Sequence, residues 1–199
     1  MTTDLYALEA PAQNLLFREA HTAKTFTNEP VTDQQVAAIY DLIKWGPTMT
    51  NSQPLRIVLA RSDDARARVV SHMLPSNADK TASAPLIAVL AADMKFNRHI
   101  ERIFPDMPHM AKMYENDGFR EPIADSQAWM QAGYFVMGVR AIGLDACPML
   151  GLDRPGLDAD LFADSDLRCI TVVLIGKPGP DAYGQRLPRL NYDEVVSVL

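Results

Sequence analysis

Apolar positions recur along the chain with two different periods, and each period predicts one kind of element. Val36, Ile39, Tyr40 and Ile43 follow the 3.6-residue spacing of an amphipathic helix. The segment Thr32-Asp33-Gln34-Gln35 stands just before them and matches a capping box, in which the first and fourth residues satisfy each other's backbone amides. The pattern predicts a helix that begins after Thr32 and buries these four apolar side chains.

Three other segments have the patterns of strands. Leu55, Ile57 and Leu59 occupy every second position of 55–61, which predicts a strand with one buried face. The runs 85–92 and 170–175 are almost wholly apolar, and such runs are typical of strands covered on both faces. We therefore expect a sheet with at least two buried strands.

The longest predicted helix begins at Asp125 as its N-cap and runs to about Ile142, with Gly143 as its stop. Apolar side chains surround most of its circumference, which is typical of a helix in a large core or a subunit interface. Gly133 and Gly138 each cost about 1 kcal/mol relative to alanine inside a helix. Their presence suggests a closely approaching backbone, and in a chain of 199 residues we favour an interface with a second copy of this helix.

The remaining segments predict shorter elements. Helices are expected over 12–20, from Ser62 onward and from Asn191 onward, and Pro75-Ser76-Asn77-Ala78-Asp79-Lys80 is expected to break the second of these. The stretch 104–122 holds three prolines, and we interpret it as a mobile excursion or partly helical lid. Helices that alternate with buried strands predict an α/β or α+β layered fold, with residues 1–199 as one domain.

Composition narrows the class of protein. A net charge of −6 and a pI near 5.1 argue against a nucleic-acid binder, and no apolar run is long enough to cross a membrane. Cys147 and Cys169 fit no metal or disulfide spacing, so we expect buried thiols in a reducing cytoplasm. The acidic segment Met1–Glu9 does not look like a signal peptide. We expect a cytoplasmic protein with no nucleic-acid or membrane partner.

Candidate chemistry is spread over polar turns next to core elements. The densest turn is Trp45-Gly46-Pro47-Thr48-Met49-Thr50-Asn51-Ser52-Gln53-Pro54, which composition alone explains equally well as a solvated loop or as a polar edge that binds a planar heterocycle. Residues 21–24 and 186–189 carry cations and hydroxyls suited to a phosphate. The four histidines lack metal-ligand spacing, and no phosphate-binding glycine loop is present, so we expect no metal and no dinucleotide fold.

These turns, taken in order, resemble the FMN-dependent nitroreductase family. The motifs that carry the resemblance are H-T-x-K-x-F, G-P-T-x-x-N-S-Q-P, N-x-x-K followed by A-P, G-L-D-x-x-P-M-x-G, and L-P-R. They cover the chain from about Leu15 to Leu190, and their wording is most similar to the malonic semialdehyde reductase branch. The resemblance implies an α+β fold in α/β/α layers with a mixed central sheet, and a homodimer with two FMN sites at the subunit interface.

The resemblance also implies a role for each motif in binding FMN. The phosphate and ribityl chain would be held by His21, Thr22, Lys24 and Arg189. The partner subunit would supply Pro47, Thr48, Asn51 and Gln53 along the isoalloxazine. The pyrimidine edge would meet Asn77 and Lys80, and the turn Pro148-Met149-Leu150-Gly151 would pass near flavin N5 with its backbone N–H groups.

Two positions depart from the family pattern. Many members have arginine where this chain has Ala20, so phosphate binding would depend more on Lys24, Arg189 and Arg186. Many also have glutamate where this chain has Leu150, and leucine serves equally well if the contact there is a backbone N–H. Taken singly, lysines such as Lys24 and Lys80 are more often solvated surface residues than ligands.

The resemblance implies a ping-pong oxidoreductase in which NAD(P)H, as NADH or NADPH, gives hydride to flavin N5 and a small acceptor then takes it. No catalytic side chain is required. If the acceptor is malonic semialdehyde, its carboxylate needs a cation, and Arg102, Lys112 and Arg120 are candidates. A broad nitroaromatic or quinone reductase is the alternative enzyme, and a flavin-binding module without turnover is a less favoured alternative.

Overall fold

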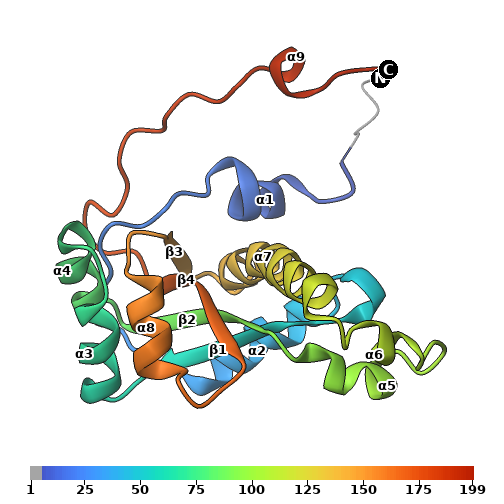
Figure 1. Ribbon diagram of the computed structural model, residues 1–199. Helices are drawn as coiled ribbons and strands as arrows, with labels where there is room; N and C mark the ends of the chain where they lie inside the picture. Colours follow the sequence, from blue (N-terminus) through green and yellow to red (C-terminus); the bar gives the residue numbers. More distant parts are fainter. Residues whose placement is uncertain (1–5) are drawn as a thin grey trace.

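The computed structural model describes residues 6–199, and its centre is a four-stranded sheet (Figure 1). The strand order is β1-β2-β4-β3, with β1 Leu55–Ala60, β2 Leu86–Asp93, β3 Asp145–Met149 and β4 Leu167–Gly176. β1 and β3 are therefore the two edges of the sheet. The segment Met1–Glu9, which does not look like a signal peptide, lies partly outside the described residues.

Helices of very different lengths connect and flank these strands (Figure 1). They are α1 Ala10–Gln13, continued by a π-helical turn Asn14–Arg18, α2 Asp33–Ile43, α3 Asp63–Ser71, α4 Pro75–Ser83, α5 Ile100–Ile103, α6 Met110–Met113, α7 Asp117–Ala141, α8 Arg154–Leu161 and α9 Tyr192–Val195. Two 3-10 turns, η2 Met49–Asn51 and η3 Phe96–His99, precede β1 and α5.

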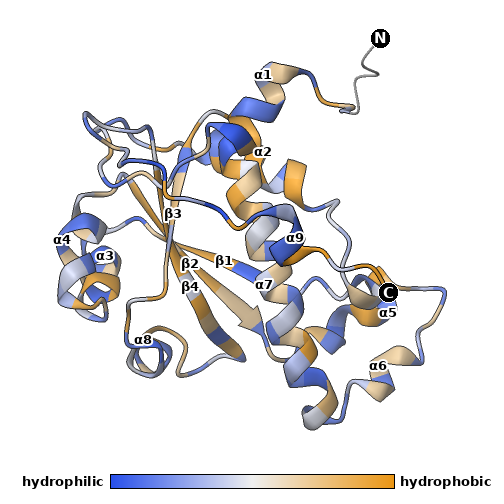
Figure 2. Cartoon of the chain, turned by 90° about the horizontal axis from the view of Figure 1, so that it is seen from above, coloured by the Kyte–Doolittle hydropathy of each residue, from blue (hydrophilic) through white to orange (hydrophobic). Residues whose placement is uncertain are grey.

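The molecule has three layers. Helices α2 and α7 cover one face of the sheet, and α3, α4 and α8 cover the other, so that each face has its own apolar core (Figure 2). Every residue of β2 is buried, as its apolar run predicted. The layered α+β prediction is confirmed, but all strand pairs in residues 6–199 are antiparallel, where a mixed sheet was expected.

A bulge in β4 explains how this strand serves both cores. Opposite Leu90 and Ala91 of β2, the register of β4 steps from Thr171 to Cys169, so that Ile170 is the extra residue. Val173 and Ile170 therefore face the same core although they are three positions apart in the sequence. Without the bulge, a strict two-residue alternation would send one of them to the opposite face.

The helix predicted from the capping box is confirmed as α2. The Gln35 backbone N–H donates to Thr32 Oγ1 over 3.2 Å, and the Thr32 N–H donates to Gln35 Oε1 over 2.9 Å. Ile39 and Ile43 are buried in the core, as expected. Tyr40 is wrongly predicted as inward, because its side chain is 57% exposed in the single chain.

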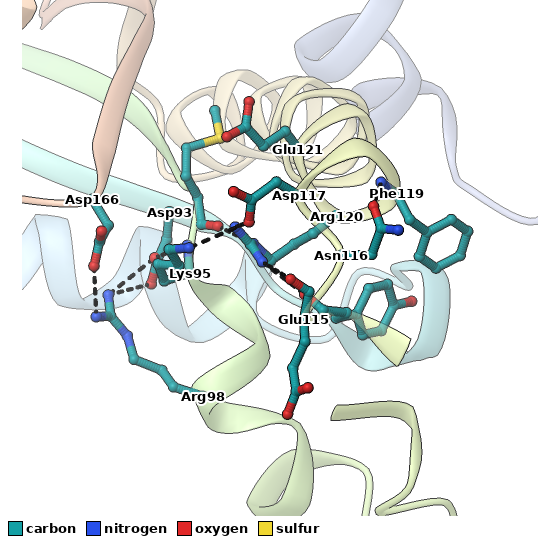
Figure 3. A network of polar contacts seen from close by, with 12 residues as sticks. Asp93, Lys95, Arg98, Glu115, Asn116, Asp117, Phe119, Arg120, Glu121 and Asp166 are labelled. Atoms are coloured by element: carbon teal, nitrogen blue, oxygen red, sulfur yellow. Dashed lines mark hydrogen bonds and ion pairs between the residues drawn. The ribbon is translucent and has the colours of Figure 1, made fainter. Parts of the chain in front are cut away.

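Helix α7 begins earlier than predicted, at Asp117 with Asn116 as its cap, and Asp125 lies inside it. Pro122 was interpreted as part of an irregular excursion, but it lies within the helix. The buried Arg120 holds this first turn in place by donating to the carbonyl oxygens of Tyr114 (2.8 Å) and Met94 (Figure 3). Because Met94 and Tyr114 lie outside the helix, the helix propensities of residues 117–125 could not reveal this stabilisation.

Helix α7 ends where it was predicted to end, but the close neighbour of Gly138 is not the one expected. Gly143, with φ of +79°, terminates the helix in the left-handed conformation that glycine adopts freely. A Cβ on Gly138 would lie 2.5 Å from Ile43, so the close neighbour of Gly138 is α2 of the same chain, not a partner's helix. A Cβ on Gly133 would meet nothing within 4 Å.

Three further differences concern short segments. The helix capped by Ser62 ends at Ser71, before Pro75, as predicted, but residues 75–83 form a second helix, α4. Pro75 occupies its first turn, where the missing N–H has no intrahelical partner to lose. Residues 145–149 form strand β3, where only a polar turn was expected at 148–151. The predicted first helix over 12–20 is instead α1 with its π-helical turn over 10–18.

Candidate functional site

The segment after α1 pairs with the chain that follows β4, and this pairing assembles the first group of polar residues. The Lys24 N–H donates to the Ala182 carbonyl over 2.8 Å, and the Thr27 N–H donates to the Lys177 carbonyl over 2.9 Å. A β-bridge between Phe26 and Pro178 lies between these two contacts. Residues 21–24 are therefore held beside residues 182–189, although more than 150 positions separate them in the sequence.

The two segments enclose a cavity of about 640 Å³, which we call the cationic hollow. Its polar lining residues are His21, Thr22, Lys24, Arg140, Gln185, Arg186 and Arg189. All five predicted residues of the phosphate group are thus brought together. The concentration of guanidinium and ammonium groups makes the hollow a place for an anion with several oxygens, such as a phosphate ester.

Arg140 in the last turn of α7 was missed by sequence reasoning. One of its terminal nitrogens donates to the His21 carbonyl over 3.4 Å, while its buried Nε has no hydrogen-bond partner among the described residues. A buried donor without an acceptor is unfavourable in a finished site, so this group fits an anionic ligand in the hollow. Arg140 is the only charged residue between Trp129 and Ile142, and that isolation was the available signal.

His21 is positioned by an aromatic neighbour that was also missed. Its ring stacks on Tyr183 with 5.0 Å between the ring centroids, and the Tyr183 hydroxyl donates to Asp145 Oδ2 over 2.6 Å. Burial, followed by this hydrogen bond, raises the pKa of Tyr183 to about 12. The hydroxyl therefore stays protonated at neutral pH. Its hydrogen bond to Asp145 holds Tyr183, and the His21 ring stacked on it, next to the beginning of β3.

The second group lies at the end of β3 and the turn after it. Asn77 on α4 donates its side-chain amide to the Gly151 carbonyl over 3.1 Å, and the same carbonyl accepts the Leu74 N–H over 2.9 Å. A Cβ on Gly151 would lie 2.3 Å from that amide nitrogen, so glycine allows the close approach. Within the turn, Met149 is buried and Leu150 is 61% exposed.

Lys80 lies one turn after Asn77 on α4 and reaches the same strand. Burial raises the pKa of the Cys147 thiol, and the charge of the neighbouring Lys80 opposes that rise. Cys147 and Cys169 are both free and buried, as predicted, and burial raises the pKa of Cys169 to about 12. The two thiols are therefore protonated core residues and are not nucleophiles.

The third group is the loop of residues 47–53, which has unusual backbone geometry. Thr50, Asn51 and Gln53 have φ angles of +50°, +51° and +43°, a region that residues other than glycine seldom occupy. Such conformations cost of order 1 kcal/mol or more each and persist only where the surroundings enforce them. Polar density in the sequence marked this loop, but its strain was visible only in the structure.

Contacts with the end of α5, with Tyr114 just after α6 and with α7 provide that enforcement. The Asn51 amide donates to the Ile103 carbonyl over 2.6 Å, and the hydroxyls of Thr50 and Tyr114 share a hydrogen bond of 2.7 Å. The Tyr114 ring is completely buried and Met110 is largely so, which anchors part of the stretch 104–122 to the core. This stretch contains the short helix α6 and the first turns of α7, consistent with its partly helical prediction.

Two glutamines of α7 complete the support of this loop. Gln127 Oε1 accepts the Met49 N–H over 2.7 Å, and Gln131 Oε1 accepts the Leu55 N–H over 2.9 Å. Each satisfies a backbone amide that would otherwise lack an acceptor in this loop. They fix the direction in which the loop enters β1.

The three groups lie at different places on the sheet. The cationic hollow and the Asn77 turn both contact β3, at Asp145 and just after Met149. The loop 47–53 leads into β1 at the opposite edge, with β2 and β4 between the two edges. Three strand spacings amount to about 14 Å, so the loop and the hollow lie at opposite edges of the sheet.

Residues 6–199 contain neither a metal-ligand cluster nor a membrane-spanning helix. No group of three histidine, cysteine, aspartate or glutamate residues there is placed to hold a metal ion. No helix there is long and apolar enough to cross a membrane.

Comparisons with known proteins support the resemblance that the sequence motifs indicated. The family model described as "Nitroreductase family" matches residues 17–177. A Streptomyces coelicolor protein with the provisional name "NADH dehydrogenase/NAD(P)H nitroreductase" is 52% identical over 193 residues, which are 96% of this chain and 98% of that protein.

Solved structures share the fold at low sequence identity. A Bacillus subtilis protein provisionally named a nitroreductase has a TM-score of 0.85 at 20% identity, covering 96% of this chain and all of that one. An Exiguobacterium sibiricum protein, also provisionally named a nitroreductase and solved in complex with FMN, has a TM-score of 0.83 at 17% identity, covering 99% of this chain and all of that one. The match of the family model and the identity to the Streptomyces relative both span most of the chain, and this protein belongs to the nitroreductase family.

Proposed function

We propose that this chain is an FMN-dependent reductase that oxidises NAD(P)H, as NADH or NADPH, and acts as a homodimer on malonic semialdehyde. The observation that carries the proposal is the cationic hollow, where Lys24, Arg140, Arg186 and Arg189 surround one cavity and a buried donor of Arg140 has no partner. The size and charge of this hollow suit the phosphate of FMN. The FMN in a solved neighbour and the NAD(P)H in the name of a relative support the same choice.

Each protein group would have a separate task in holding FMN. The cations of the hollow, with Thr22 and His21, would bind the phosphate and ribityl chain. Asn77, whose amide is held on the Gly151 carbonyl, and Lys80 would lie on the pyrimidine edge, where a cation favours negative charge on the ring. The turn 148–151 would offer backbone N–H groups near N5. FMN itself would supply the hydride chemistry, and no side chain is required as acid or base.

A second copy of the chain would complete each site. The loop 47–53 lies at the edge of the sheet opposite to the hollow, so it would serve the hollow of a partner. The C-terminal arm, residues 184–199, runs clear of the three layers (Figure 1) and exposes Leu187, Leu190 and Val195 by 72%, 70% and 66%. Several exposed apolar side chains along one arm are typical of a surface that docks on a partner, and a second subunit would cover them.

A visible absorption spectrum tests the cofactor. The purified protein should be yellow or take up one FMN per chain, and addition of NADPH or NADH without oxygen should bleach the flavin band. A colourless protein that takes up no FMN contradicts the proposal. Sedimentation at micromolar concentration should give a dimer.

Acceptor turnover then separates the alternatives. With matched NADPH, the proposal expects faster turnover of malonic semialdehyde, to 3-hydroxypropionate, than of a nitroaromatic or a quinone. The reverse order identifies a broad nitroaromatic or quinone reductase. FMN binding without NAD(P)H oxidation by any acceptor identifies a flavin-binding module.

A further inference from the structure

The three cations suggested for an acceptor carboxylate have different environments. The Arg120 side chain is 1% exposed, and its guanidinium donates to backbone carbonyls and pairs with Asp117 (Figure 3). It therefore has no free face for a ligand, and its candidacy was wrong. Lys112 lines a hollow that it shares with the acidic Glu101 and Glu115. Arg102 forms no hydrogen bond or ion pair with any described residue.

Arg102 lines a different cavity, of about 440 Å³, which we call the Arg102 hollow. Its other polar lining residues are Tyr40, Ser52, Gln53, Arg56 and His99. None of the lining residues is acidic, although the chain as a whole carries a net charge of −6. The charged side chains of this hollow are therefore positive, whereas the protein as a whole is negative.

The cations near the Arg102 hollow outnumber the carboxylates that balance them. The fully buried Asp93 accepts from Arg56 over 2.6 Å and from Arg98 over 3.0 Å, so one carboxylate faces two guanidiniums. Arg98 has Asp166 as a second partner at 3.2 Å, whereas Arg102 adds a charge without a partner. Burial, followed by the charge of Arg56, lowers the pKa of His99 even though Asp93 opposes the shift. Arg56 and Arg102, the arginines that line the hollow, therefore have between them only the buried carboxylate of Asp93 as an ion-pair partner among the described residues.

A buried hydroxyl at the same cavity also has no partner. Ser52 is 1% exposed, and its Oγ forms no hydrogen bond with any described residue. A buried hydroxyl without a partner costs free energy, and a ligand oxygen in the hollow would remove that cost. The hollow thus combines a free cation with a free donor, which are the two groups that a carboxylate needs.

We propose that the Arg102 hollow binds the carboxylate of an acidic acceptor, with Arg102 as its ion pair and the Ser52 hydroxyl as a hydrogen-bond donor. This inference rests on the proposed function, because it places the hollow beside the flavin of the partner subunit. Gln53 belongs both to the hollow and to the loop 47–53, and Asn51 of that loop bonds the carbonyl of Ile103, next to Arg102. The loop that would border the flavin and the cation that would bind the acceptor are therefore one connected unit.

Steady-state kinetics of the FMN-loaded dimer test the proposal. Arg102→Met should raise the KM for malonic semialdehyde by about 10- to 100-fold, because hydrogen bonds to charged groups contribute about 1.5–3 kcal/mol. The KM for propanal, which has the same carbon chain without the carboxylate, should stay within about twofold, and turnover of menadione should be unchanged. Lys112→Met removes a nearby cation from another hollow and should leave all three acceptors unaffected.

Two further variants measure how much the charge of Arg102 and the hydroxyl of Ser52 each contribute to binding the carboxylate. Arg102→Lys should recover part of the lost affinity, because it keeps the charge without the planar fork. Ser52→Ala should raise the KM for the carboxylate acceptor by about 3- to 10-fold, as loss of a single donor does. Equal effects of Arg102→Met on malonic semialdehyde and propanal would overturn the proposal. An effect on the KM for NADPH alone, compared with NADH, would assign the hollow to the cofactor's phosphate instead.

A binding measurement separates failure of this inference from failure of the proposed function. Propionate should raise the pKa of His99, followed by NMR, because an anion in the hollow favours the imidazolium. The neutral propionamide should not, and Arg102→Met should abolish the response. This readout needs no turnover, so a protein that fails to oxidise NADPH can still support the carboxylate site. A protein that reduces menadione but shows no response to propionate contradicts the site alone.

Discussion

Asn77 donates its side-chain amide to the Gly151 carbonyl over 3.1 Å, and a methyl group on Gly151 would lie 2.3 Å from that amide nitrogen. Gly151→Ala should therefore displace Asn77 and weaken FMN binding by about 10-fold, equivalent to one lost hydrogen bond of about 1.4 kcal/mol. Flavin fluorescence titration measures the change. Ser76→Ala, on the exposed side of the same helix, is the control and should bind FMN as the parent does. Unchanged affinity in Gly151→Ala would contradict the assigned role of Asn77.

The two glycines of α7 should differ when each is replaced by alanine. Gly138→Ala should lower the free energy of unfolding by about 1–3 kcal/mol, because the new methyl group overlaps Ile43 in a packed core. Gly133→Ala places its methyl group in open space within the chain and should leave the fold intact. Urea denaturation followed by circular dichroism measures both. If a partner's helix packs on Gly133, its alanine variant should instead dissociate the dimer on dilution, seen by sedimentation.

Arg120 lies in the first turn of α7, and Arg168 of β4 pairs with Glu121 of the same helix, so the two arginines can be compared. Arg120→Met should destabilise the protein by about 3–5 kcal/mol, because buried carbonyl groups and Asp117 lose their donor. Arg168→Met removes a more exposed ion pair with Glu121 and should cost at most about 1 kcal/mol. Chemical denaturation at pH 7 compares the two variants. Similar losses in both would contradict a structural role for the buried arginine.

His99 should make stability depend on pH. Its pKa is lowered in the folded protein, mainly by burial and then by Arg56, so the unfolded chain binds more protons below about pH 6.5. Stability should therefore fall as the pH drops from 7.5 through 6.5 and level off below the folded pKa of His99. His99→Gln should flatten this part of the profile. The check is the urea midpoint measured at several pH values between 5 and 7.5, and an identical profile in His99→Gln would contradict the assignment.

Arg140 should matter for the cofactor more than for the fold. Arg140→Met should weaken FMN binding by about 10- to 100-fold, the cost of losing one charge-assisted contact to phosphate. Lys177→Met removes an equal charge that pairs with Glu29 at the surface, and it should leave FMN affinity unchanged. Riboflavin, which lacks the phosphate, provides a second control, because its affinity should be insensitive to Arg140. Equal losses for FMN and riboflavin would show that Arg140 does not contact the phosphate.

Sequence patterns predicted the elements whose signals are local. The apolar run of β2 and the capping box of α2 act through their own residues, so both were found. Strand β3 was missed because it is short and contains Pro148, and an edge strand tolerates a proline that a central strand would reject. The beginning of α7 was missed because Arg120, in the first turn, is held by the carbonyl groups of Met94 and Tyr114, which lie outside the helix.

For the candidate site too, the sequence revealed the residues that stand in local motifs and not those that depend on tertiary packing. His21, Lys24 and Arg189 stand in recognisable motifs, and the structure gathers them in one hollow. Arg140 belongs to no motif, and its place in that hollow depends on how α7 packs against the segment before Ala23. Neither the left-handed backbone of Asn51 nor the missing partner of Ser52 has a counterpart in a linear pattern.

The strand order that places β1 and β3 at opposite edges has a consequence for mixtures of variants. In the proposed dimer, a chain damaged at Lys24 keeps a sound loop 47–53, and a chain damaged at Asn51 keeps a sound cationic hollow. Each homodimer of damaged chains lacks a working centre. Hybrid dimers of the two carry one centre with both defects and one with neither, so activity should reappear by complementation when the chains are unfolded together and allowed to reassemble.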